Sequence, residues 1–89
     1  MISGDVTIIN KLGLHARATG AFVNCAKAFT SEVRIGPDGG LVDGKSIMAV
    51  MMLAAAQGTV LRLETEGEDE RDAFDAIEAL INDYFGEGE

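Results

Sequence analysis

The sequence has little of what marks an exported or membrane-bound protein. It contains one cysteine, Cys25, which cannot form a disulfide within the chain. No stretch approaches the roughly 20 consecutive apolar residues of a membrane span. The residues after Met1 lack the basic start and apolar run of a signal peptide. We therefore expect a cytoplasmic protein that does not interact with membranes.

The chain also lacks linkers, internal repeats and low-complexity segments, apart from its closing Gly-Glu-Gly-Glu stretch. Its 89 residues fit a single domain over residues 1–89, without room for a second domain. A chain of this size buries only about 60 to 65% of its unfolded surface. Most of the apolar residues, 47% of the chain, must therefore be used in one core.

Basic residues are scarce and unevenly distributed. The net charge is −8, and residues 64–89 hold 11 of the 15 acidic residues, with Arg71 as the single base among them. Nucleic acid is a poor partner for such a chain, because phosphate backbones require clustered Lys and Arg. The other six basic residues all precede residue 64, so an anion site is expected in that part of the chain.

The order of apolar and polar residues predicts four strands and three helices. Strands are expected over residues 5–10, 32–35, 41–43 and 59–66, with a Gly- and Pro-containing turn between the middle two. Helices are expected over residues 16–29, from Ser46 as N-cap to Ala56, and from Asp69 as cap to about Tyr84. The order β-α-β-β-α-β-α favours a two-layer α+β fold with the helices on one face of the sheet.

The two longer predicted helices each carry one apolar stripe. The helical spacing of apolar residues in the first of these helices predicts that Cys25 is buried and has a packing role, with a reactive thiol as the alternative. The first stripe comprises Ala18, Phe22, Cys25 and Phe29, with Val23 and Ala26 beside it. The stripe of the last helix comprises Ala73, Phe74, Ile77, Leu80, Ile81 and Tyr84.

His15, the only histidine, stands where a turn meets the start of the first helix. The first N–H groups of a helix have no partner within it, and the helix dipole favours negative charge there. A phosphate beside His15 can take hydrogen bonds from the N–H groups of Ala16 and Arg17 and can meet the Arg17 guanidinium. The alternative is that His15 is an ordinary cap and Arg17 a solvated residue of the first turn.

Histidine suits the carriage of a phosphoryl group. An imidazole with an ordinary pKa near 6.5 is largely neutral at pH 7, and its free lone pair can attack phosphorus directly. Phosphoryl transfer needs mainly positioning and charge stabilisation, so we expect neither a bound metal nor a cofactor. Because the chain has no nucleotide-binding loop, the donor has to be another molecule.

These features resemble the HPr phosphocarriers of the bacterial phosphotransferase system, over nearly the whole chain. Gly13-Leu14-His15-Ala16-Arg17 is similar to the family's phosphorylation site, and Gly44-Lys45-Ser46-Ile47-Met48 to its regulatory-serine segment. The family often has proline after the His-Ala-Arg stretch, where Ala18 and Thr19 stand here, so the first helical turn is less rigid. This departure and the Met-rich segment look more like the nitrogen-related branch, NPr, than the sugar branch.

The resemblance implies an HPr-like open-faced sandwich with a four-stranded antiparallel sheet covered by three helices. It also implies a monomer whose His15 accepts a phosphoryl group, derived from phosphoenolpyruvate, from enzyme I and passes it to an enzyme IIA-type protein. The protein is then a covalent intermediate in transfer rather than a self-standing enzyme. Ser46, a good N-cap, is by the same resemblance a phosphorylation site for an HPr kinase/phosphorylase.

The second predicted helix is apolar nearly all round, although a helix on a sheet buries only one face. If Val50, Leu53 and Ala54 face the sheet, the remaining apolar side chains form an exposed patch for partner docking. That patch comprises Ile47, Met48, Met51 and, in the wider version, Met52. Methionine adapts to several surfaces, as a carrier with changing partners requires. The alternative is that Met51 and Met52 belong to the core.

Two other functions remain open from the sequence. One is a regulatory protein of the same family that binds its targets while His15 is largely idle. The other is a small-molecule-sensing α+β domain. Incubation with phosphoenolpyruvate and enzyme I separates the carrier from the sensor, because only the carrier gains an acid-labile phosphate.

Overall fold

A computed structural model describes all 89 residues, and its element order agrees with the predicted one. The strands are β1 (Ile2–Thr7), β2 (Glu32–Gly36), β3 (Val42–Asp43) and β4 (Val60–Glu66). The helices are α1 (Ala16–Lys27), α2 (Ile47–Met51) and α3 (Glu70–Asn82), followed by a short 3₁₀ helix (Tyr84–Gly86). No helix is long and apolar enough to cross a membrane.

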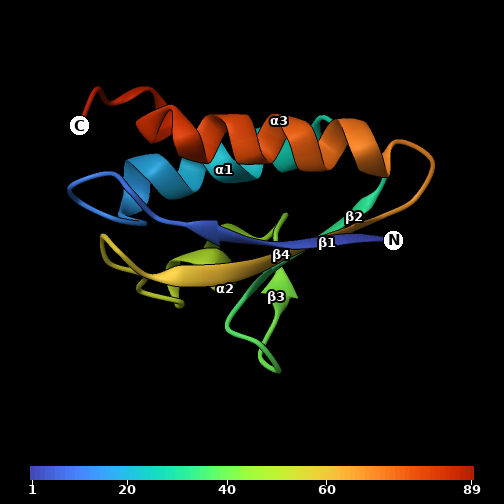
Figure 1. Cartoon of the computed structure of the whole chain (residues 1–89), viewed down its shortest axis with the longest axis horizontal. Coiled ribbons are helices and arrows are strands. Elements are labelled where there is room, and N and C mark those ends of the chain that lie inside the picture. Colours follow the sequence, from blue (N-terminus) through green and yellow to red (C-terminus); the bar gives the residue numbers. More distant parts are fainter.

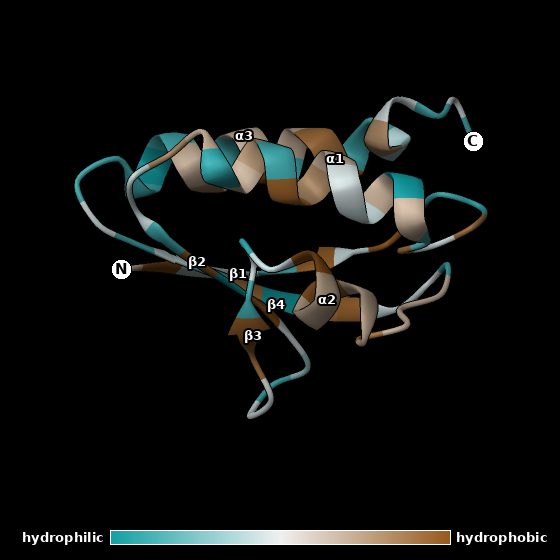
Figure 2. Ribbon diagram, turned by 180° about the vertical axis from the view of Figure 1, so that it is seen from behind, coloured by the Kyte–Doolittle hydropathy of each residue, from teal (hydrophilic) through white to brown (hydrophobic).

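The strands form one antiparallel sheet, as predicted, and their order within it is β1-β4-β2-β3. Helices α1 and α3 lie side by side over one face of it (Figure 1). The alternation predicted for β4 is confirmed, because Leu61 and Leu63 are buried while Arg62 and Glu64 lie on the other, partly exposed side. Val50 of α2 is fully buried, and α2 packs against α1 and β3 (Figure 2).

The core lies between the sheet and the helices, and the predicted stripes supply seven of its 17 buried residues. Cys25 is half-buried against this core, and burial raises the pKa of its thiol. Both observations favour packing over reactivity, since the thiolate is the reactive form. The fully buried large side chains of the core include Phe22, Ile35, Leu63, Ile77 and Ile81.

Several predicted element boundaries were wrong, among them the end of α1, which is Lys27 instead of Phe29. β1 begins at Ile2 and ends at Thr7, because its register is set by antiparallel pairing with β4. α2 ends at Met51 instead of Ala56, since Ala54 adopts a left-handed conformation (φ 49°) that stops the helix and leaves this residue exposed. α3 ends at Asn82, so Tyr84 is exposed and the next residue, Phe85, is buried instead.

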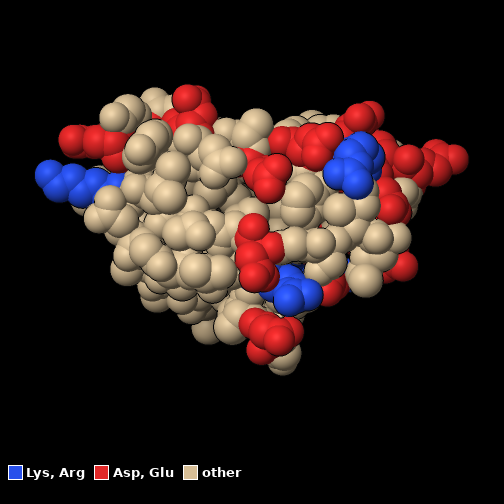
Figure 3. Space-filling view, viewed as in Figure 1, with Lys and Arg blue, Asp and Glu red and all other residues tan.

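Acidic side chains gather over α3, as Figure 3 shows along the upper side of the molecule. They lie on the outer side of the helix, as its apolar stripe predicts. Asp69 precedes this helix but makes no side-chain capping bond to it, contrary to the prediction. Its carboxylate instead accepts hydrogen bonds from Thr30 and Ser31, which connects the start of α3 to the approach to β2.

Candidate functional site

His15 is the N-cap residue of α1, as its place in the sequence predicted. Its backbone is extended (φ −77°, ψ 179°), and its carbonyl accepts the N–H of Thr19 at 2.9 Å, which begins the helix. The side chain turns back over the helix start, where Nδ1 accepts the backbone N–H of Arg17 at 3.3 Å. About 28% of the imidazole side chain is exposed. The imidazole therefore lies at the start of the helix, beside the backbone N–H of Arg17, as the sequence predicted.

The turn before His15 is held by hydrogen bonds and by a close backbone contact. Asn10 is fully buried, and its side-chain amide donates to the Gly13 carbonyl at 2.8 Å. The N–H of Leu14 donates to the Ala55 carbonyl at 2.8 Å. Gly13 has φ 67°, and a Cβ there would collide with the backbone oxygen of Ala55. Glycine is therefore required at this position, and the loop after α2 is fastened beside His15.

The exposed Arg17 side chain contributes to a small hollow of about 120 Å³. Lys11 and Leu12 also line this hollow, as do Glu87 and Glu89 from the end of the chain. Two basic and two acidic side chains therefore share this hollow. Ala16, the other predicted phosphate contact, is the first residue of α1 and is exposed.

Glu87 is part of the site, although the sequence analysis did not predict it. Its Oε2 lies 2.5 Å from Nε2 of His15, and its Oε1 accepts the Asn10 side-chain amide at 3.0 Å. Burial raises the pKa of this carboxyl, but the hydrogen bonds from Asn10 and His15 outweigh burial and hold the pKa below its ordinary value. Glu87 is therefore a carboxylate at neutral pH. No local pattern in a Gly-Glu stretch points to such a contact.

The two ring contacts of His15 agree on where the proton is. A carboxylate only accepts hydrogen bonds, so Nε2 carries the hydrogen that faces Glu87. A backbone N–H only donates, so Nδ1 presents its lone pair to Arg17. In the neutral ring the free lone pair is consequently that of Nδ1, at the helix start.

Ser46 caps α2, as predicted. Its hydroxyl oxygen accepts the Ala49 N–H at 3.2 Å, and the residue is half-buried. The cap places Ser46 directly before the apolar side chains of α2 and contributes about 1 kcal/mol to that helix.

The apolar side chains of α2 form an exposed surface, which we call the Met patch and define as Ile47, Met48, Met51 and Met52. Their exposed fractions are 50%, 74%, 42% and 79%, so the alternative that Met51 and Met52 are core is wrong. The contact between Leu14 and Ala55 fixes the segment after α2 against the turn that carries His15. The segment that follows the Met patch therefore packs against the residue that precedes His15.

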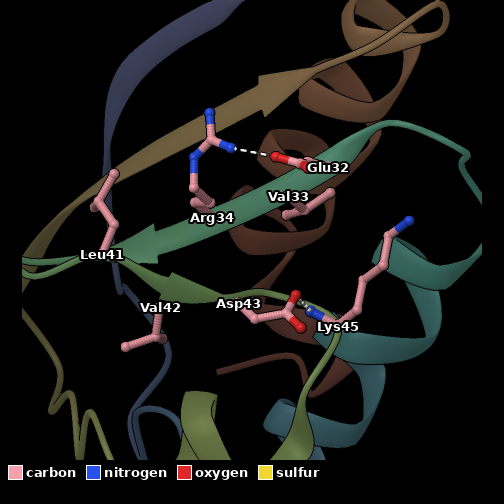
Figure 4. Close-up of a pocket in the computed structure, with 7 residues that line it drawn as sticks. All are labelled: Glu32, Val33, Arg34, Leu41, Val42, Asp43 and Lys45. Carbon is pink, nitrogen blue, oxygen red and sulfur yellow. Dashed lines mark hydrogen bonds and ion pairs between the residues drawn. The ribbon is translucent and has the colours of Figure 1, made fainter.

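A larger hollow, of about 440 Å³, lies at β2 and β3 and does not include His15 (Figure 4). Its basic groups are already engaged. Arg34 pairs with Glu32, Glu64 and Glu66, and Lys45 donates its Nζ to the Phe29 carbonyl. An anion entering this hollow would have to displace those partners, so the phosphate chemistry expected from the sequence fits the His15 region instead. No three His, Cys, Asp or Glu side chains converge on a metal site.

Comparison with known proteins assigns the family. Residues 2–83 match the family model described as "PTS HPr component phosphorylation site". The chain belongs to the HPr family of phosphocarriers of the phosphotransferase system. This confirms the resemblance seen in the two motifs.

Named relatives and solved structures agree with this membership. The phosphocarrier protein HPr of Neisseria meningitidis serogroup A is 56% identical over 89 residues, and that of Pseudomonas putida is 58% identical over 91, each with both chains fully covered. The crystal structure of HPr-C-His from Thermoanaerobacter tengcongensis has a TM-score of 0.93 at 42% identity, covering 98% of both chains. The HPr-like fold is thereby confirmed, while assignment to the nitrogen-related branch stays a prediction.

Proposed function

We propose that His15 carries the phosphoryl group on Nδ1, receiving it from enzyme I and passing it to an enzyme IIA-type protein. The observation that carries this proposal is the position of Nδ1, 3.3 Å from the Arg17 N–H at the start of α1. The other ring nitrogen is covered by Glu87. Only Nδ1 thus has both a lone pair and an anion-binding helix start beside it.

In the proposed transfer, the Nδ1 lone pair forms a bond to phosphorus while the bond between phosphorus and the donor's atom breaks, and that electron pair leaves with the donor. The N–H groups of Ala16 and Arg17 then face the phosphoryl oxygens, and the Arg17 guanidinium neutralises part of their charge. Passing the group to the acceptor is the same displacement in reverse, with the acceptor's nucleophile as attacker. Neither step uses a metal or cofactor bound to this chain.

Both partners have to reach His15, and the Met patch is the proposed docking surface. An apolar, methionine-rich surface can pack against differently shaped partners in turn. We expect the protein to act as a monomer, since a stable dimer through the Met patch would block docking. Light scattering coupled to size exclusion tests this expectation, because an elution mass of two chains at working concentration would contradict it.

The carrier role is tested by incubation with phosphoenolpyruvate and enzyme I, read by intact-protein mass spectrometry. One phosphate is expected, and it should be lost in acid but stable in alkali, as is characteristic of a phosphorylated imidazole. His15→Ala should fold normally and stay unmodified, because the residue is partly exposed and its ring supplies the nucleophile. Phosphorylation of that variant would move the site elsewhere, and an unmodified parent chain would favour a regulatory role with His15 idle.

We further propose Ser46 as a regulatory phosphorylation site. The support is its half-buried hydroxyl at the start of α2, directly before Ile47 and Met48. A phosphoryl group there adds about −1.5 to −2 charges beside the Met patch, which opposes apolar docking. An HPr kinase/phosphorylase with ATP should therefore modify the parent chain but not Ser46→Ala, and the modified chain should accept phosphate from enzyme I more slowly. Equal acceptance by both forms would contradict the switch.

A further inference from the structure

The residues after α3 have a defined conformation and contact the rest of the protein. After α3 the backbone is left-handed at Tyr84 (φ 58°), Phe85 (φ 53°) and Gly86 (φ 79°), which is unfavourable for the two residues that have a Cβ. Phe85 is nevertheless held there because its ring is buried in the core, with 7% exposed. The bend directs the following residue, Glu87, toward the loop between β1 and α1, on the side where the chain ends in Figures 1 and 2.

Two hydrogen bonds hold the Glu87 carboxylate in place, one to each oxygen. Oε1 accepts the amide of Asn10, which is fully buried and also donates to the Gly13 carbonyl. Oε2 faces His15 Nε2 at 2.5 Å. Only 9% of the Glu87 side chain is exposed. Asn10 thus fixes both the turn that carries His15 and the carboxylate that contacts its ring.

The charge balance of the proposed transfer gives this contact a role. When the neutral ring donates its Nδ1 lone pair to phosphorus, the imidazole gains a positive charge while the proton stays on Nε2. A carboxylate that accepts this Nε2–H stabilises the developing charge and keeps the ring from rotating or changing tautomer. This is the relationship that an aspartate has to the histidine of a catalytic triad.

We propose that Glu87 is a positioning residue for phosphoryl transfer, which holds His15 in the Nε2–H tautomer with Nδ1 directed at the start of α1. The inference rests on the proposed carrier function and adds to it a residue that acts through the ring. It does not touch the phosphoryl group, which approaches the opposite nitrogen. The carboxylate also stays ionised, since its pKa is lowered by its two hydrogen-bond donors against the effect of burial.

The matched variants are Glu87→Ala and Glu89→Ala. Both residues line the same hollow, but the Glu89 side chain is exposed and the His15 ring is bonded to Glu87. Glu87→Gln is the conservative variant, because its amide oxygen can still accept the Nε2–H without carrying a charge. Circular dichroism and thermal melting of all three variants establish that they are folded.

The first measurement is the ¹⁵N chemical shift of each His15 ring nitrogen, recorded above about pH 8 where the ring is neutral. In the parent chain Nε2 should be the protonated nitrogen and Nδ1 the unprotonated one. Glu87→Ala should move the two resonances toward each other as the tautomers mix. Glu87→Gln should preserve most of the difference, and Glu89→Ala all of it.

The second measurement is the single-turnover rate of phosphorylation by enzyme I. Glu87→Ala should be about three- to tenfold slower than the parent chain, with Glu87→Gln between them and Glu89→Ala unchanged. Unchanged chemical shifts and an unchanged rate in Glu87→Ala would overturn the proposal. A faster rate would overturn it as well, because it would show that Glu87 blocks His15. These results leave the carrier function standing, whereas a parent chain that accepts no phosphate contradicts the carrier function and this inference together.

Discussion

The carboxylate of Asp69 accepts both the hydroxyl and the backbone N–H of Ser31, at 2.5 and 2.9 Å. The N–H of Thr30 is a further donor at 3.0 Å. The Ser31 hydroxyl and then the Thr30 N–H lower the pKa of Asp69 to about 2, because they stabilise the ionised form. A side chain 38 residues away in sequence thereby fixes the entry to β2.

This contact predicts a specific dependence of stability on pH. The contribution of Asp69 is fully present above its ordinary pKa of 3.8 and is lost as the pH falls toward about 2. Asp69→Asn should therefore be less stable than the parent chain at pH 7, and urea unfolding should show the difference shrinking between about pH 4 and about pH 2. A difference that stays constant over that range would assign the loss to packing instead of ionisation.

Arg17→Ala should slow phosphoryl acceptance by about 10- to 100-fold, because it removes a charge-assisted contact to the transferred group. The nucleophile and both backbone donors remain, so acceptance should not be abolished. Arg17→Lys should recover part of the rate, since it keeps the charge but not the planar fork. Rapid-quench assays with enzyme I measure these rates. If alanine and arginine give equal rates, the guanidinium plays no part in transfer.

The Met patch predicts a docking effect without a folding effect. Met48→Glu should raise the KM for this protein as a substrate of enzyme I by about tenfold, because a glutamate would be desolvated in an apolar interface. The free energy of unfolding should change by less than about 0.5 kcal/mol, since the side chain is 74% exposed. Val60→Glu is the control, as Val60 is also apolar and exposed but lies outside the Met patch on β4. Equal KM values for the two variants would exclude the patch.

Gly13→Ala should destabilise the protein more than Gly39→Ala. Both glycines have positive φ, 67° and 82°, so each substitution carries a backbone cost of about 1 to 2 kcal/mol. At Gly13 the new Cβ would also collide with the Ala55 carbonyl oxygen, whereas at Gly39 nothing lies within 4 Å. Chemical denaturation compares the two. Equal losses would show that the turn can move away from Ala55 without cost.

The parts of the fold that follow local rules were predictable from the sequence. The alternation in β4, the apolar stripes of α1 and α3, and Ser46 as a cap each depend on residues within a few positions. The single histidine at a helix start identified the candidate site for the same reason. The methionines of α2 were left open, since their exposure depends on how far the helix runs.

Features set by distant contacts were not predictable in this way. The range of β1 follows from its pairing with β4, and α2 ends where the chain turns to let Ala55 meet Leu14. Asp69 looks like a cap in the sequence, but Ser31 offers it stronger donors. Glu87 lies in a segment without periodicity, and its contact with His15 exists only because Phe85 is anchored in the core.

The buried Phe85 side chain determines how a carboxylate is brought to His15. Only Gly86 separates the buried Phe85 from Glu87, so the Glu87 carboxylate encounters the imidazole as a tethered group. A short tether gives the attached group an effective concentration in the millimolar range or above. Free carboxylates present in solution below that concentration therefore do not displace it. Because a tethered group cannot diffuse away, the Glu87 carboxylate stays beside the imidazole through each round of transfer, and the contact re-forms after any local opening of the chain end.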